Sequence, residues 1–349
     1  MTNSFPNLNF NRRRRGPLPI VIGILVVASI ALVSLSGFYA DWLWFKSVDF
    51  TEVWSTILLT KATVFVIAGL ATSLVITLNV YIAFRKRPLY VPLTSEADNL
   101  ERYRSQIEPI RRLVLVGLAL VLFYFGGSSA SQLWDTWLLF RNATPFGVTD
   151  PQFGLDISFF AFKLPMYQAL VGWAISTLVF AIIGSAIVHY LYGGIRPQVA
   201  QERTTVAARV QLSVLLGLVV LLKAVAYWLD RYALALKENR LITGLTYTDV
   251  NALLPAKAIL AGIAVICSLL FFANIVRKSW LLPAAGTALL VVSSVLIAGI
   301  YPAAIQQFQV KPSESSKEAP FIQRNIDATR DAFGLSAVEV KDFQATLNA

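Results

Sequence analysis

Lys223 is the ionisable residue most suited to a chemical role, because it lies inside an apolar stretch, Val210–Leu229, that is long enough to cross a membrane. A lysine held in hydrocarbon costs about 3 kcal/mol on insertion scales, so it persists most easily beside a partner or a wet cavity. In a span that runs outward, helical side chains tilt toward the helix N-terminus, which leans Lys223 toward the bilayer centre. Tyr227 and Asp230 follow on the same face. We predict that Lys223 faces other helices, with a polar side chain or backbone carbonyl in reach; the alternative that stays open is a lysine that only reaches the membrane surface.

Seven aspartates form a second group of residues that could take part in chemistry, and we expect all of them on the outer side of the membrane. Carboxylates brought together there would bind a divalent cation. Aspartate is also a common residue of turns and helix caps, as Asp150 before Pro151 illustrates. We favour turn and cap roles and predict no metal site, and we keep Asp150, Asp156 and Asp249 as candidate functional residues beside the group around Lys223. The seven are Asp41, Asp49, Asp135, Asp150, Asp156, Asp230 and Asp249.

Recognisable catalytic patterns are absent from the sequence. It contains no phosphate-binding loop, nucleophile elbow or metalloprotease motif. One histidine, His189, and one cysteine, Cys267, exclude a multi-histidine metal centre and an internal disulfide. No aspartate or glutamate falls within a predicted span, whereas proton-coupled carriers usually have one. We therefore predict no cofactor, lean away from an enzyme and rank a transporter below a structural role.

The composition places these residues in a membrane protein. The chain has 349 residues, of which 56% are hydrophobic and 14% charged, and its mean hydropathy is +0.63. Soluble domains carry about 25% charged residues. We attribute the net charge of +10 to lysines and arginines in loops that meet anionic lipid, and not to nucleic acid. The predicted partners are the lipid bilayer and envelope proteins, and the oligomeric state is left open.

Seven apolar stretches of about 20 or more residues predict an all-α, polytopic fold with about seven transmembrane helices. The third ends in small residues, Gly126–Ser131, which favour close helix packing over a substrate path. The predicted spans are Leu18–Ala40, Ala62–Phe84, Leu113–Leu133, Ala169–Leu191, Val210–Leu229, Ala258–Val276 and Trp280–Ile305.

The charges of the loops predict the orientation. Arg12–Arg15 stand directly before the first span, and more than half of all lysines and arginines fall on that same side. The first apolar run is too long for a cleaved signal peptide, and Phe38 stands where cleavage would need a small residue. Seven of the eight tryptophans lie near the opposite boundary. We predict the plasma membrane, with the amino terminus inside and the carboxyl terminus outside.

Two loops carry structure of their own. In the inner loop from Arg85 to Arg112, Ser95 begins a predicted short helix, which either lies on the membrane surface or is a solvated linker. In the outer loop from Trp134 to Lys163, apolar residues alternate with polar or small ones between Phe153 and Phe159. That loop is too apolar for free solvation, so we expect it to pack on the membrane face or among the spans.

The last segment differs from the rest. Residues 1–16 form a predicted basic cytoplasmic tail and residues 17–305 the membrane domain, whereas residues 306–349 contain no membrane-length apolar run. We interpret 306–349 as the start of an extracytoplasmic region that is truncated here. Four residues, ending with Phe333, line one face of a predicted helix that stops at Gly334. They are Ile322, Ile326, Thr329 and Phe333.

Three separated groups of residues together resemble the uncharacterised protein family numbered 0182, large multi-spanning bacterial membrane proteins. The resemblance covers nearly the whole chain. Members typically continue into a large extracytoplasmic domain after seven spans, and no established activity carries over, so the resemblance implies a topology without a catalytic residue. The groups are Asp150-Pro151 with Gly154-x-Asp156-Ile157-Ser158-Phe159-Phe160 and Leu164-Pro165; Gly244-Leu245-Thr246-Tyr247-Thr248-Asp249-Val250-Asn251-Ala252 with Leu254-Pro255; and Pro302, Gln307-Phe308-x-Val310-x-Pro312, Glu318, Pro320, Ile322 and Asn325-Ile326-x-x-Thr329-Arg330.

These observations favour a membrane anchor or assembly scaffold for an extracytoplasmic domain. Two alternatives stay open: a transporter or channel, and an enzyme that acts on lipid or envelope substrates at the outer face. Substrate-dependent flux in reconstituted vesicles would favour the transporter.

Overall fold

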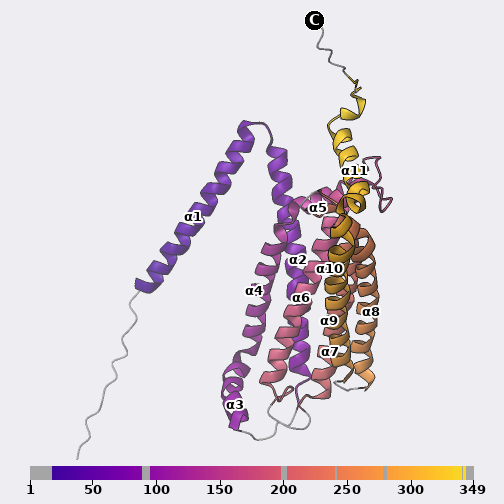
Figure 1. Ribbon diagram of the computed structural model, residues 1–349. Coiled ribbons are helices and arrows are strands. Elements are labelled where there is room, and N and C mark those ends of the chain that lie inside the picture. Colours follow the sequence, from indigo (N-terminus) through magenta and orange to yellow (C-terminus); the bar gives the residue numbers. More distant parts are fainter. Residues whose placement is uncertain are drawn as a thin grey trace, which may run out of the picture. The chain divides into compact units, whose positions relative to one another are not determined.

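The computed structural model describes residues 18–88, 95–197, 203–239, 242–277, 281–339 and 341–342 (Figure 1). These residues form helices and loops and no β-strand, apart from three isolated bridges. Seven helical runs in the described part are long and apolar enough to cross a membrane, which confirms the predicted fold class. They are Val21–Ser47, Thr51–Arg85, Leu100–Ser131, Phe159–Leu191, Val206–Leu236, Asp249–Arg277 and Leu281–Ala332.

The chain divides into two compact units, the first of which ends at Thr60. Within it, helix α1 (Leu18–Ser47) turns at Asp49, which has a φ of 63°, into the beginning of α2 (Thr51–Arg85). The rings of Phe38 and Trp54 meet edge to face, with centroids 4.9 Å apart, across this turn. Arg12–Arg15, on which the predicted orientation depends, lie outside the described residues.

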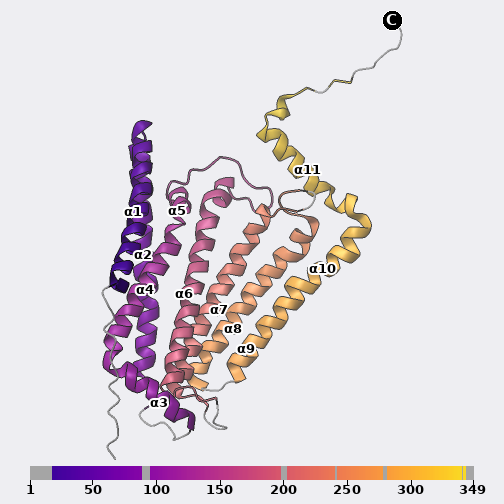
Figure 2. The same ribbon diagram turned by 90° about the vertical axis from the view of Figure 1, so that its left-hand side faces the viewer.

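The second unit, from Lys61 to Ala349, is a bundle of helices. Figure 2 shows α6, α7, α8 and the run from α9 to α10 side by side, and the closest packing is between α7 and α8. Its long helices are the rest of α2, α4 (Arg111–Ser131), α6 (Leu164–Leu191), α7 (Val206–Ala233), α8 (Leu254–Arg277), α9 (Leu281–Ser293) and α11 (Glu314–Ala332), and the short α10 (Tyr301–Ile305) lies between the last two.

Small residues allow α4 to approach α2 closely. A Cβ atom on Gly127 would lie 2.6 Å from the carbonyl oxygen of Phe65, and one on Gly126 would lie 2.8 Å from the Cβ of Thr72. Neither distance leaves room for a side chain. The close packing predicted for the end of the third span is therefore confirmed.

The interior holds apolar and polar contacts, while many large apolar side chains are exposed on the helix surfaces. Ile76, Val80 and Leu215 belong to one buried cluster. Beside the apolar core, the Gln211 amide donates to the Asn79 carbonyl over 2.8 Å and lies 3.0 Å from His189 Nε2. Outward apolar surface with satisfied polar groups inside is the pattern expected of a bundle surrounded by lipid.

Two short helices mark the ends of the second unit. α3 (Ser95–Ile107) confirms the helix predicted in the loop between the second and third spans, and the buried Arg104 fixes it by donating to the Leu191 carbonyl over 2.6 Å. α5 (Trp134–Arg141) lies at the opposite end, where α11 also begins (Figures 1 and 2). We call these the α3 end and the α11 end.

The helical path does not stop at Ile305, where the last predicted span ends. After α9 it continues through π-helix η5 (Ser294–Ile300), α10, π-helix η6 (Gln306–Val310) and a 3-10 turn into α11. Pro302 and Pro312 each fall at the start of one of these short segments. Each proline follows a π segment closely, where the change of hydrogen-bond register interrupts the regular ladder to which a proline cannot donate. As predicted, α11 ends before Gly334, whose φ is 67°.

Candidate functional site

At the α11 end, a polar cavity of about 500 Å³ lies among the loop before α8, the run from α10 to η6, and α11. Two of the three residue groups that resemble the family meet in its wall. Asp249 and Glu318 are its buried acids and Lys237 stands opposite Asp249. The following side chains line it: Lys237, Asn239, Thr246, Thr248, Asp249, Gln306, Lys311, Glu314 and Glu318, with Ile242, Leu253, Pro302, Ala303 and Ile322 as its apolar part.

Asp249 is fully buried and has a partner for each of its oxygens. Its Oδ1 is 2.9 Å from Lys237 Nζ, and its Oδ2 accepts from the backbone N–H of Thr246 over 3.0 Å and from the Thr246 hydroxyl over 2.7 Å. The Asp249 N–H donates back to the Thr246 hydroxyl over 3.3 Å. This reciprocal pair is a capping box, which starts the helical run through η4 (Asp249–Leu253) into α8.

Glu318 joins α11 to the same loop. Its side chain is 5% exposed, and its two oxygens accept from the Tyr247 N–H over 3.3 and 3.0 Å. Lys317 lies 4.7 Å above the Tyr247 ring, and Asn325 donates to the Thr243 carbonyl over 3.0 Å. Sequence reasoning quoted Glu318 in a family motif but did not select it as a functional residue. The sequence offers no local signal that separates Glu318 from the other acids of this helix.

Asp150 and Asp156 hold the turns of the loop between α5 and α6. Asp150 Oδ2 accepts from the N–H groups of Gln152 and Phe153 over 2.9 and 2.7 Å. Asp156 accepts from the N–H groups of Phe146, Gly147 and Ser158 over 3.1, 2.9 and 2.8 Å. Both therefore occupy turn positions, and in the described residues no group of three or more histidines, cysteines and acids could hold a metal ion.

This loop also packs on the bundle, as its apolar sequence predicts. The Phe153 and Tyr232 rings lie 5.1 Å apart, and Phe160 is 4% exposed. Arg324 on α11 donates to the Gln152 amide oxygen over 3.4 Å. A second cavity of about 180 Å³ lies where the loop, the 242–245 segment and α11 meet. The family-like residues between Asp150 and Pro165 therefore also lie at the α11 end, together with the two groups that line the polar cavity.

Hydrogen bonding makes Asp156 sensitive to acid. The Ser158 side chain and then the N–H groups of Phe146 and Ser158 hold the pKa of this carboxyl well below its usual value of 3.8. A depressed pKa contributes stability that is complete above about pH 4 and is lost as the pH falls through the folded-state pKa. We expect Asp156→Asn to flatten the loss of thermal stability between about pH 4 and pH 2 in detergent. Asp135→Asn, which alters an exposed aspartate bonded to the neighbouring Thr136, should lose stability at low pH as the wild type does.

The three candidates on α7 lie elsewhere. The Lys223 side chain is exposed and its ammonium lies 5.0 Å from the centre of the Tyr227 ring. The Tyr227 hydroxyl is 3.2 Å from the hydroxyl of Ser294, and Asp230 forms an ion pair with Lys257 at 3.2 Å. The expectation that Lys223 faces other helices is therefore wrong. Its own helix supplies an aromatic ring one turn away, and a cation–π contact needs no partner on another helix.

The fold and this site define a class of protein: an all-helical chain with seven helices of membrane-spanning length and a polar cluster that ties its last helix to one end of the bundle. The model of the uncharacterised protein family UPF0182 matches residues 18–349. The chain belongs to this family.

Curated relatives support the assignment. A UPF0182 protein of Streptomyces coelicolor is 46% identical over 95% of this chain, and one of Nocardioides sp. is 47% identical over 97%. A third, from Frankia casuarinae, is 43% identical over 94%. The alignments cover 34%, 34% and 32% of those proteins, so the chain spans about a third of the length of these relatives. No solved structure matches the chain significantly.

Proposed function

We propose that this chain is the membrane-embedded part of a larger protein of the plasma membrane, and that it anchors an extracytoplasmic part through α11. The observation that carries the proposal is the attachment of α11 to the bundle. Glu318 is a buried acid whose two oxygens both accept from the Tyr247 N–H. A helix fixed at its base in this way transmits its position to whatever follows it, as a scaffold requires.

The relatives and the loop charges support the same proposal. The curated relatives are about three times as long as the stretch that this chain matches. Basic side chains gather at the α3 end, where Arg87 pairs with Glu108 and Arg104 holds α3. Under the positive-inside rule this end belongs in the cytoplasm, and the α11 end then lies outside. Envelope proteins would meet the protein at the α11 end.

A labelling experiment tests the proposed orientation. The only cysteine, Cys267, is buried and is replaced by serine; single cysteines then replace the exposed Ser105 on α3 and Ser315 on α11. An impermeant maleimide added to intact cells should label Ser315→Cys, and Ser105→Cys should react only after the membrane is opened. Labelling of both from one side would overturn the proposal.

A second experiment tests the anchoring role. Glu318→Ala should detach the base of α11, so that limited proteolysis cuts between residues 311 and 324 at least ten times faster than in the wild type. Glu314→Ala, which changes a neighbouring acid without the bond to Tyr247, is the matched control and should be cut at the wild-type rate. Equal cleavage of the wild type and Glu318→Ala would mean that α11 is not held by this contact.

A transporter and an outer-face enzyme remain the alternative proposals. The feature that would serve either is the polar cavity beside Asp249, since it combines acids, lysines and amides at one end of the bundle. If reconstituted vesicles showed substrate-dependent flux, and Gln306→Leu in the cavity wall reduced it, the transporter proposal would replace the anchor proposal.

A further inference from the structure

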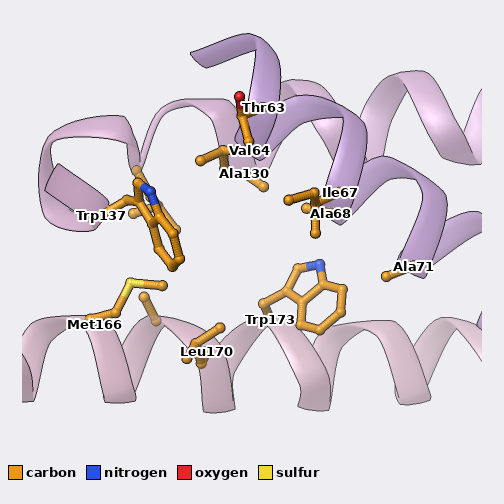
Figure 3. A pocket seen from close by; sticks show the side chains of 12 residues that line it. Thr63, Val64, Ile67, Ala68, Ala71, Ala130, Trp137, Met166, Leu170 and Trp173 are labelled. Carbon is orange, nitrogen blue, oxygen red and sulfur yellow. The ribbon is translucent and has the colours of Figure 1, made fainter. Parts of the chain in front are cut away.

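A third cavity, near the α11 end of the second unit, differs from the polar one in having an almost entirely apolar wall. Its volume is about 170 Å³, and it lies among α2, the end of α4, α5 and α6 (Figure 3). Figure 3 shows the rings of Trp137 and Trp173 bordering it, with Met166 and Leu170 from α6 on one side and Ile67 from α2 on the other. Ile67 is 62% exposed and Leu170 46% exposed, so the cavity opens on the exposed helix surface of the second unit.

The chemistry of the wall selects hydrocarbon. The Trp173 indole N–H is already used, because it donates to the Thr72 hydroxyl over 3.0 Å. A water molecule needs two to four polar partners, and an apolar cavity of about 150 Å³ stays dry and accepts a small hydrocarbon. A cavity of this size and lining, open toward lipid, is filled most favourably by a segment of an acyl chain.

A cation stands at the α11 end of the cavity. Lys61 lies on α2 just before the wall residues Thr63 and Val64, and its ammonium is 5.3 Å from the centre of the Trp134 ring at the start of α5. The wall continues along α2 to Ala71, ten residues beyond Lys61, which is about 15 Å of helix. Half of a bilayer's hydrocarbon thickness is also about 15 Å.

These three observations fit one ligand. We propose that the cavity is a lipid site that holds one acyl chain of an anionic phospholipid, whose phosphate pairs with Lys61. The headgroup then lies at the level of Lys61 and Trp134, and the chain runs past Trp137 and Trp173 toward the middle of the bilayer. The site is independent of the anchoring role of α11.

Fluorescence quenching by brominated lipid tests the proposal, since Trp137 and Trp173 border the cavity. The protein is reconstituted in phosphatidylcholine vesicles that contain a small fraction of either brominated phosphatidylglycerol or brominated phosphatidylcholine. The wild type should be quenched at a lower fraction of the anionic lipid. Lys61→Gln should reduce this preference about five-fold, the factor that corresponds to about 1 kcal/mol for one lysine beside an anionic surface.

Filling the cavity should remove the quenching that comes from it. Ala68→Phe on α2 and Ala169→Phe on α6 place a ring in the cavity from opposite walls, so a folding defect in one variant does not decide the result. Val116→Phe changes an exposed position on α4 outside the cavity and is the matched control, with quenching as in the wild type. Unchanged quenching in both folded filled variants, or equal quenching by the two lipids in the wild type, would overturn the proposal. If the wild-type tryptophans were protected from the brominated lipids only when the protein is oligomeric, the cavity would be a contact with a second copy of the chain. That result would also overturn the proposal.

Discussion

Gly127→Leu is expected to destabilise the bundle by about 3 kcal/mol or more, at or above the upper end of the usual overpacking penalty. The new Cβ would lie 2.6 Å from the Phe65 carbonyl oxygen and 2.9 Å from the Phe65 ring. A backbone oxygen cannot turn away as a flexible side chain can, so α4 and α2 would have to separate. Thermal melting in a mild detergent and the yield of folded protein both measure the effect.

Gly117→Leu is the matched control, because Gly117 lies on the same helix and a Cβ there meets nothing within 4 Å. Leucine favours a helix over glycine by up to about 1 kcal/mol, so this variant should be unchanged or slightly more stable. If the two variants melted together, α4 would not be packed on α2 at Gly127. The same pair of variants separates the role of small residues in packing from their intrinsic effect on the helix.

The spans could be predicted from the sequence because length and hydropathy are local properties. Membrane-spanning helices satisfy their own backbone hydrogen bonds, so an apolar run of sufficient length carries most of the information about each one. The small residues at Gly126 and Gly127 also predicted close helix packing, because residues without large side chains allow two helix backbones to approach closely. The final span was harder, because its apolar run ends near Ile305 and predicts an end there, whereas the structure continues the helical path past Pro302 and Pro312 into α11.

The site was predicted less completely, because its contacts join residues far apart in the sequence. The T-x-x-D pattern of Thr246 and Asp249 is a local capping signal, and Asp150 before Pro151 is a local turn signal. The bond from Tyr247 to Glu318 crosses 71 residues, and nothing local distinguishes Glu318 from exposed acids on α11. The prediction that Lys223 faces other helices was wrong for a related reason: the tilt of a side chain does not tell which sides of α7 pack inward. Leu215 and Ala224 are buried on different sides of α7, whereas Lys223 is exposed.

Lys237→Met is expected to lower the free energy of unfolding by about 2 to 3 kcal/mol. It would leave the Asp249 carboxylate, which is 1% exposed, without its cation. Removing one partner of a buried pair costs about 3 to 5 kcal/mol, and the 43% exposure of the Lys237 side chain places this pair below that range. Unfolding in a titrated denaturing detergent, followed by tryptophan fluorescence, measures the loss.

Lys257→Met is the matched control, since its partner Asp230 is 37% exposed and remains hydrated when the lysine is gone; its cost should be at most about 1 kcal/mol. The double variant Lys237→Met/Asp249→Asn carries no buried charge at this site, while the new amide oxygen still accepts from Thr246. It should therefore be more stable than Lys237→Met alone, although each change removes part of the ion pair. Equal losses in Lys237→Met and Lys257→Met, or a double variant less stable than the sum of its single changes, would mean that Lys237 does not neutralise Asp249 at the wall of the polar cavity.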